Sequence, residues 1–234
     1  MQKTLNKYEE GQVLLVNKEY QWTSFDAVRK LRNTMRIKKV GHAGTLDPLA
    51  TGLLIICTGK FTKKINEYMA QEKEYTGTIT LGARTPTYDL ESEPQDLVSI
   101  DHLTEEQIRA ATAPFIGTIQ QLPPAHSAIK KDGKRLYELA RAGKEVVLEP
   151  RTVTIKEFEI TRIEGPEVDF RVVCTTGTYI RSLAHDFGAA LGVGAYLSAL
   201  CRTRIGPFLN SDAKTVGEWE AIIREDLRSQ ISDV

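Results

Sequence analysis

The 234-residue chain lacks most of the features that would assign it quickly to a class of proteins. It has only three cysteines and no CxxC pair, which excludes a disulfide framework and a cysteine-based zinc site. No apolar run is long enough to cross a membrane, and the N-terminus lacks the apolar stretch of a signal peptide. Neither GxxxxGK[ST] nor GxGxxG occurs, so no motif supports a nucleotide cofactor. We therefore expect a cytoplasmic protein with reduced cysteines.

The chain also has no net charge at pH 7, because its 31 basic residues balance its 31 acidic ones. Taken alone, this balance argues against a nucleic-acid partner. The charges are segregated, however: residues 29–40 carry six Lys or Arg and no acid, residues 130–144 carry six against two acids, and residues 89–106 carry seven acids and no Lys or Arg. Such segregation can present a basic face to a polyanion, although solvated helix surfaces explain it equally well.

The hydrophobic pattern predicts a mixture of strands and helices. Strands are expected at 13–16, 53–57, 73–85, 151–160 and 168–176. Helices are expected at 25–33 with Ser24 as N-cap, at 105–112 from a Thr104–Gln107 capping box, at 180–191 and at 214–230. Residues 89–102 read as an acidic loop, and residues 120–150 as a basic, partly helical excursion from the core. Because no βαβ units repeat, we expect an α+β fold with a mixed, largely antiparallel sheet.

Chemistry is suggested first by GHAGTLDPLATGLL, residues 41–54, which sets Asp47 in a tight glycine loop before a buried strand. Read locally, Asp47 can simply initiate a turn before Pro48. Likewise Arg181 can be a surface residue, Tyr75 a core residue and His42 a structural hydrogen-bonding group. A metal site has no third ligand at a recognisable spacing, and a Ser-His-Asp triad has no GxSxG elbow.

The same loop resembles the signature of pseudouridine synthases of the TruB family. In family order, KEYTGTITLGARTPTYD resembles the second motif, QQLPPAHSAIKKDGKRLYELARAG the RNA-gripping insertion, GTYIRSLAHDFG the third motif and GAYLSALCRTRIGPF the closing strand. The chain departs from the family at Glu19 and Gln21, where Pro and Gly are usual, and at His126, where Tyr is common. We expect a single pseudouridine synthase domain over residues 1–234, with its insertion at about 120–150 and no C-terminal PUA domain.

This resemblance implies isomerisation of a uridine in the T loop of tRNA, at position 55, with flipping of the base and no cofactor. By resemblance, Asp47 is the catalytic carboxylate, Arg181 its cationic partner and Tyr75 the residue that stacks on the flipped base. The sequence leaves open whether Asp47 attacks the base, attacks the sugar or removes a sugar proton.

RNA contacts are expected from a wider set of residues. The set is His42, Lys18, Asp89, Lys130, Arg141, Tyr179, Leu200, Lys38 and Lys39. The expected partner is the T stem-loop of tRNA. We expect the protein to bind it as a monomer, and we expect neither a guide RNA nor a membrane as a partner. The alternative is a tRNA-binding or tRNA-folding module with little catalysis. Intact Asp47, Tyr75 and Arg181 argue against this alternative, because a pure binder needs none of them.

Overall fold

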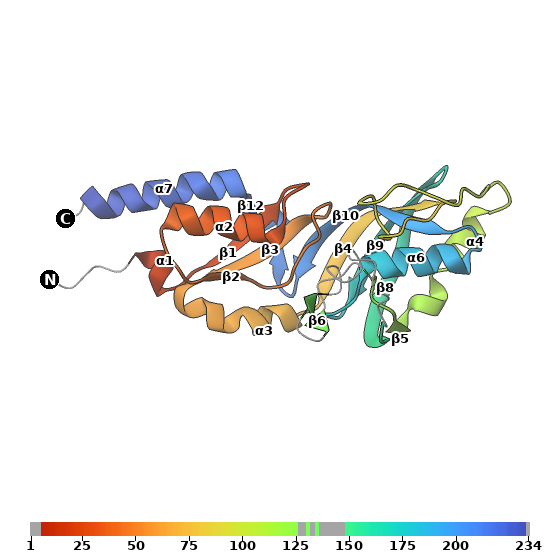
Figure 1. The fold of residues 1–234 in the computed structure, drawn as a ribbon, viewed down its shortest axis with the longest axis horizontal. Coiled ribbons are helices and arrows are strands. Elements are labelled where there is room, and N and C mark those ends of the chain that lie inside the picture. Colours follow the sequence, from red (N-terminus) through yellow and green to blue (C-terminus); the bar gives the residue numbers. More distant parts are fainter. Residues whose placement is uncertain (1–5, 126–129, 132–133, 136–147, 233–234) are drawn as a thin grey trace. The chain divides into compact units, whose positions relative to one another are not determined.

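The computed structural model describes residues 6–125, 130–131, 134–135 and 148–232, and most of its strands belong to a 10-stranded sheet (Figure 1). Its main path runs β12-β1-β3-β10-β4-β9-β8-β5, with β2 on β3 and β11 on β10. The strands are β1 (Val13–Lys18), β2 (Val40–His42), β3 (Thr51–Thr58), β4 (Lys73–Leu81), β5 (Gly117–Gln121), β8 (Arg151–Glu164), β9 (Glu167–Cys174), β10 (Ala195–Ile205), β11 (Phe208–Leu209) and β12 (Lys214–Thr215). The pairs β1–β12 and β3–β10 are parallel, whereas β1–β3, β2–β3, β5–β8, β8–β9 and β10–β11 are antiparallel. The predicted α+β class with a mixed, largely antiparallel sheet is confirmed.

The helices flank this sheet. They are α1 (Lys7–Glu10), α2 (Ser24–Met35), α3 (Ile65–Ala70), α4 (Glu105–Ala110), α6 (Ile180–Ala190) and α7 (Val216–Ser232), with the 3-10 turns η1 (Gly59–Lys64), η2 (Ala113–Phe115) and η3 (Asn210–Asp212). Contacts group the chain into two compact units. Unit 1 comprises residues 1–75 and 201–234, and unit 2 comprises residues 76–200. The single domain expected from the sequence stays a prediction.

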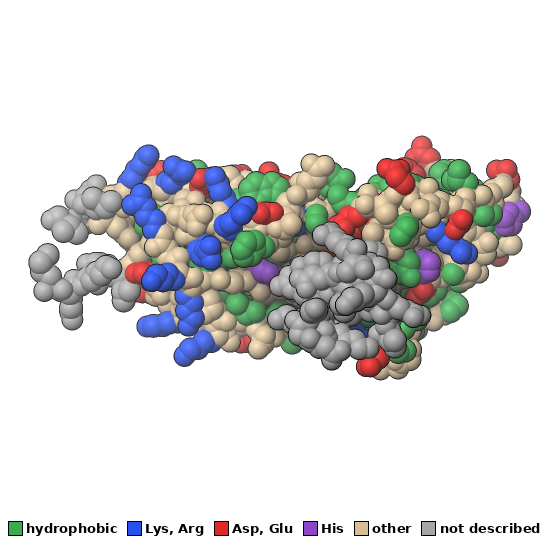
Figure 2. Space-filling view, viewed as in Figure 1, with side chains coloured by type: hydrophobic (Ala, Val, Ile, Leu, Met, Phe, Trp, Pro, Cys, Tyr) green, Lys and Arg blue, Asp and Glu red, His purple; other side chains and the backbone are tan. Residues whose placement is uncertain are grey.

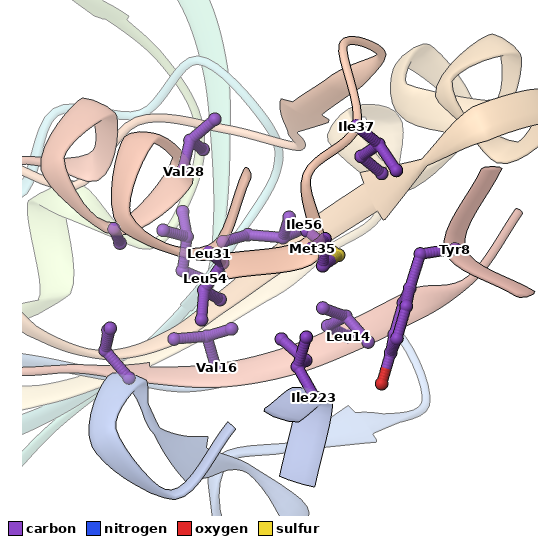
Figure 3. Close-up of a cluster of buried hydrophobic side chains, with 12 residues drawn as sticks. Tyr8, Leu14, Val16, Val28, Leu31, Met35, Ile37, Leu54, Ile56 and Ile223 are labelled. Carbon is purple, nitrogen blue, oxygen red and sulfur yellow. The ribbon is translucent and has the colours of Figure 1, made fainter. Parts of the chain in front are cut away.

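The core of unit 1 is built on both faces of β3. On one face Leu54 and Ile56 pack against α2 and α7, which lie side by side (Figures 1 and 3). On the other face Leu53, Ile55 and Cys57 pack against apolar side chains of η1 and α3. Burial on both faces explains why β3 reads as a continuous apolar run rather than an alternating one. It also makes β3 a rigid support for the loop that precedes it.

Helix α2 begins one residue earlier than predicted. Thr23, not Ser24, is the N-cap: its side chain accepts a hydrogen bond from the Asp26 N–H, and the Asp26 carboxylate accepts one from the Thr23 N–H. Ser24 is buried instead, where its Oγ donates to the Leu46 carbonyl at 3.1 Å and accepts from the Leu46 N–H at 2.9 Å. The first turn of α2 is therefore tied to the loop that carries Asp47.

The core of unit 2 contains a cluster of phenylalanines among aliphatic side chains. Phe158 of β8 contacts Phe170 of β9, Phe187 of α6 and Phe115 of η2, with ring centroids 5.5–6.3 Å apart. These contacts hold α6 against the sheet. The predicted α4 capping box between Thr104 and Gln107 is present.

Residues 120–150 were expected to form a basic, partly helical excursion, and the described part of this segment contains a short strand pair that was not predicted. Residues Lys130–Lys131 (β6) and Lys134–Arg135 (β7) form an antiparallel pair. The Asp-Gly sequence between the two strands is a strong hairpin signal. Our interpretation of the sequence gave more weight to the helical spacing of the residues that follow it. Arg141 and His126 lie outside the described residues.

Candidate active site

Asp47 lies in the loop that joins β2 to β3, and it is half-buried. The two strands pair antiparallel, with His42 opposite Ile56, so the loop is held at both ends. Within it the Ala50 N–H donates to the Asp47 carbonyl at 3.1 Å and closes a tight turn. The prediction that Asp47 initiates a turn is therefore correct, and the hydrogen bond that closes this turn uses its main-chain carbonyl rather than its carboxylate.

Lys18, the last residue of β1, holds this loop in place by a hydrogen bond to the Pro48 carbonyl. It is completely buried, and its Nζ donates to the carbonyls of Glu19 at 3.0 Å, Trp22 at 2.6 Å and Pro48 at 3.3 Å. Burial lowers the pKa of Lys18 to about 8, the nearby Asp47 carboxylate opposes this shift and Arg202 adds to it. The Asp47 loop thus has a buried ammonium group beside it.

Arg202 of β10 is a second buried cation, and the sequence analysis missed it. Its Nε donates to the Leu53 carbonyl at 2.8 Å and its Nη2 to the Gly44 carbonyl at 3.0 Å, while the residue is 1% exposed. Gly52 pairs with Arg202, and a Cβ at Gly52 would lie 2.4 Å from the Arg202 carbonyl oxygen. Gly52, the second glycine of the GTLDPLATG segment, was the signal in the sequence for this contact, since only glycine lets the two backbones approach so closely.

His42, the last residue of β2, is half-buried beside the same loop. Its Nδ1 is buried and has no hydrogen-bond partner. Burial, and then the charge of Arg202, lower the pKa of His42. The imidazole is therefore neutral near pH 7.

Arg181 lies in unit 2, in the first turn of α6, which Tyr179 precedes as the N-cap. The interpretation of Arg181 as a surface residue is wrong, because only 5% of the residue is exposed. Its Nη1 donates to the Thr87 carbonyl at 3.1 Å, and its Nε lies 3.7 Å from Asp89 Oδ2. Asp89 is itself 4% exposed and accepts a hydrogen bond from the Glu91 N–H. The structure therefore brings two predicted site residues, Arg181 and Asp89, together.

The remaining predicted residues lie in different surroundings. Tyr75 is on the buried face of β4 and is 8% exposed, together with Ile79 and Leu81, as the period-2 pattern predicted. Tyr179 is half-buried, and the Gln121 side-chain amide bonds its N–H and its carbonyl at 2.8 and 3.0 Å. Leu200 is half-buried on β10. Lys130 is described only by its backbone pairing in β6.

Lys38 and Lys39 are exposed between α2 and β2. The Gly59 N–H donates to the Lys39 carbonyl at 2.9 Å, so this segment lies against η1, whose Lys60, Lys63 and Lys64 are also exposed. Figure 2 shows Lys and Arg side chains gathered on unit 1. The sequence analysis missed the η1 lysines because the charges belong to two separate runs that the β2–β3 pairing brings together.

Comparison with known proteins assigns the family. Residues 32–180 match the profile of the TruB family pseudouridylate synthase N-terminal domain, and residues 181–234 match that of the tRNA pseudouridylate synthase B C-terminal domain. The chain belongs to the TruB family. The Asp47 loop falls in the first matched region, and Arg181 is the first residue of the second.

Relatives and solved structures agree with this assignment. The chain is 57% identical over 212 residues to tRNA pseudouridine synthase B of Flavobacterium johnsoniae, covering 88% of this chain and 93% of the relative. It is 49% identical over 226 residues to that of Chlorobaculum tepidum, covering 94% and 93%. Among solved structures, it matches a chain of a Cbf5-Nop10-Gar1 complex with a TM-score of 0.71 and 31% identity, over 92% of this chain and 54% of that one. It therefore spans about half the length of that structural relative.

These matches confirm the predicted family, the predicted pseudouridine synthase fold and the predicted enzyme class, an isomerase. Among the helices that the structure describes, none is long and apolar enough to cross a membrane.

Proposed function

We propose that the chain is a stand-alone tRNA pseudouridine synthase that isomerises the uridine at position 55 in the T loop, with Asp47 as its catalytic residue. The observation that carries this proposal is the 57% identity to a tRNA pseudouridine synthase B over nearly the whole of both chains. We further propose that it works in the cytoplasm as a monomer, and without a guide RNA. The match covers 93% of the length of two tRNA pseudouridine synthase B relatives but only 54% of the matched chain in the Cbf5-Nop10-Gar1 complex.

The surroundings of Asp47 support a catalytic carboxylate. Pseudouridine forms when the N1–C1′ bond of uridine breaks and a C5–C1′ bond forms, while a proton leaves C5 and N1 takes one up. Substrate and product are isomers, so the reaction consumes no oxidant or reductant. It does need one anionic group at a fixed position. Lys18 and Arg202 are buried cations that hold the Asp47 loop through the carbonyls of Pro48 and Gly44, and they fix the position of the segment that carries the carboxylate.

The other half of the proposed machinery lies in unit 2. We propose that the Arg181 guanidinium pairs with Asp47 when the uridine is bound, and that Asp89 and the Thr87 carbonyl hold Arg181 ready for that pairing. The burial of Arg181 and its contacts with Thr87 and Asp89 support this role, because a guanidinium held in this way keeps a fixed fork geometry. Tyr75 supplies the stacking surface for the flipped base.

Phosphate contacts are proposed for the basic surface of unit 1, formed by Lys38, Lys39, Lys60, Lys63 and Lys64. Their exposure and common sign support the proposal, since a chain of zero net charge must grip a polyanion through local basic surface. Lys130 and Arg141 are proposed to add contacts from the insertion.

The test is incubation of the purified chain with unmodified tRNA transcript and no other component, followed by carbodiimide mapping of pseudouridine. We expect one modified position, uridine 55. The Asp47→Asn variant keeps the shape of the side chain and removes its charge, so it should bind the transcript with unchanged affinity and form no pseudouridine. Binding without turnover by the unsubstituted chain would instead favour the tRNA-binding module. Turnover by Asp47→Asn would overturn the assignment of the catalytic residue.

A further inference from the structure

Tyr88 and His185 form a ring stack in unit 2 that no part of the proposed chemistry uses. Their ring centroids are 3.9 Å apart and their planes differ by 16°. Tyr88 lies in the loop after β4 and His185 lies on α6, so the two rings in direct contact come from segments far apart in the sequence. Tyr88 also has a backbone φ of +65°, a left-handed conformation that is unfavourable for a residue with a side chain of this size.

The backbone of Tyr88 is held at both ends. Its N–H donates to the Thr85 carbonyl at 3.2 Å, and its carbonyl accepts from the Leu197 N–H of β10 at 2.9 Å. These bonds fix the main chain of the turn, and the stack fixes its side chain. A strained residue persists only where its surroundings over-determine it, so the His185 ring is part of what keeps the turn in this form.

The two residues that flank Tyr88 both contact Arg181. Thr87, before it, accepts a hydrogen bond from Arg181 Nη1 at 3.1 Å, and Asp89, after it, lies 3.7 Å from Arg181 Nε. The conformation of Tyr88 therefore sets the direction of the Thr87 carbonyl and the position of the Asp89 side chain. Any relaxation of the turn therefore moves these two contacts with the guanidinium at once.

His185 reaches this turn from the same helix as Arg181. The two residues are four apart on α6, and side chains at this spacing lie on the same face of a helix. His185 Nδ1 is buried and has no hydrogen-bond partner, so this nitrogen does not orient the ring. Burial, followed by the charge of Arg84, lowers the pKa of His185, and the ring that stacks on Tyr88 is neutral near pH 7.

We propose that the Tyr88–His185 stack is a positioning element for Arg181. It locks the turn of residues 87–89 in the conformation that presents the Thr87 carbonyl and the Asp89 carboxylate to the guanidinium. This inference rests on the proposed function for the role of Arg181 in turnover, but the positioning itself is a property of the folded chain. His185 acts through the turn and is a positioning residue.

The proposal predicts that position 185 needs a flat ring that can stack on Tyr88, and that it does not need the nitrogen atoms of the imidazole. His185→Phe keeps a flat ring for stacking, and His185→Ala removes it. In single turnover at saturating enzyme, His185→Ala should slow pseudouridine formation about tenfold, because small misplacements of a catalytic group are costly. His185→Phe should stay within about twofold of the unsubstituted rate. The tRNA Kd should not change in either variant. His102→Ala, at an exposed histidine of the same unit, is the matched control and should change nothing.

A second readout needs no activity. The 15Nε–1Hε resonance of Arg181, assigned by its loss in Arg181→Lys, should move toward the position of a free arginine in His185→Ala and should stay in place in His185→Phe. If the resonance behaves so while the unsubstituted chain is inactive on tRNA, the proposed function fails and the positioning stands. The positioning is overturned if the resonance and the rate of His185→Ala equal those of the unsubstituted chain. It is also overturned if His185→Phe is as impaired as His185→Ala.

Discussion

Lys18 donates a hydrogen bond from its buried Nζ to the carbonyl of Pro48, at 3.3 Å, and thereby ties β1 to the residue that follows Asp47. Two further carbonyls, of Glu19 and Trp22, share the same ammonium group. A lysine with no exposed surface is costly to keep charged, and burial accordingly lowers its pKa to about 8. This single group links the stability of unit 1 to pH.

The first prediction concerns that linkage. The folded-state pKa of Lys18 lies below its unfolded value of 10.5, so between pH 8 and 10.5 the unfolded chain binds the proton that the folded chain has released. The contribution of Lys18 to the free energy of unfolding therefore rises with pH, by about 2 kcal/mol between pH 7 and 10.

Urea unfolding of the unsubstituted chain and of Lys18→Met at several pH values measures this contribution. Other titrating groups affect both proteins, so the difference between the two unfolding free energies isolates Lys18. We expect that difference to shift in favour of the unsubstituted chain as the pH rises. A difference independent of pH would mean that the buried lysine keeps its ordinary pKa.

The second prediction concerns Arg181. Arg181→Lys keeps the charge but loses the planar fork that reaches the Thr87 carbonyl and the Asp89 carboxylate. Disrupting a buried ion pair costs about 3 kcal/mol at the lower end, equivalent to about 100-fold in rate if the loss falls on the transition state. We expect turnover to fall by that factor with a small change in tRNA affinity. Arg162→Lys, at an exposed ion-paired arginine of unit 2, serves as the control, and equal rates for both variants would remove Arg181 from the machinery.

The third prediction separates the ring of Tyr75 from its hydroxyl. Tyr75→Phe keeps the stacking surface, whereas Tyr75→Leu removes both the aromatic face and the hydroxyl. If stacking on the flipped base is the whole role, Phe should retain nearly full single-turnover rate and Leu should lose most of it. If the hydroxyl takes part in proton transfer, Phe should be nearly as slow as Leu. A fast Leu variant would contradict both roles.

The fourth prediction concerns the basic surface of unit 1. Replacing Lys38 and Lys39 by Ala should weaken tRNA binding and flatten the slope of log affinity against log salt by about one to two units, because each neutralised phosphate contributes about −0.7 to −0.9. The chemical step at saturating enzyme should not change. Lys214→Ala, at an exposed lysine of β12, is the single-charge control. If the double variant and the unsubstituted chain have the same salt slope, the prediction is wrong and the phosphate contacts must come from η1 and the insertion.

The strands were predictable where local sequence reports burial directly. The apolar run of β3 reflects burial on both of its faces, and the alternation of β4 reflects burial of Tyr75, Ile79 and Leu81 on one face. The N-cap of α2 was missed by one residue. Two hydroxyl residues stand side by side there, and only the position of Asp26, three residues after Thr23, distinguishes them.

The buried cations were not predictable from local sequence. Arg202 donates to the Leu53 carbonyl across 149 positions of sequence, and such a contact exists only once β3 and β10 have paired. The same holds for the Tyr88–His185 stack and for the lysines of η1. The Asp47 loop was recognisable because its glycines and its carboxylate are neighbours in sequence. The groups that support it are neighbours only in space.

Anchoring the Asp47 loop to a strand buried on both faces has a kinetic consequence. The amide protons of β3 can reach solvent only when both apolar cores of unit 1 open together, so they should exchange with deuterium at the rate of global unfolding. The carboxylate proposed for catalysis therefore lies in a loop that leads directly into a slowly opening strand. Accommodation of differently shaped RNA loops must then come from side chains and from other segments, while the position of Asp47 stays constant from one substrate to the next.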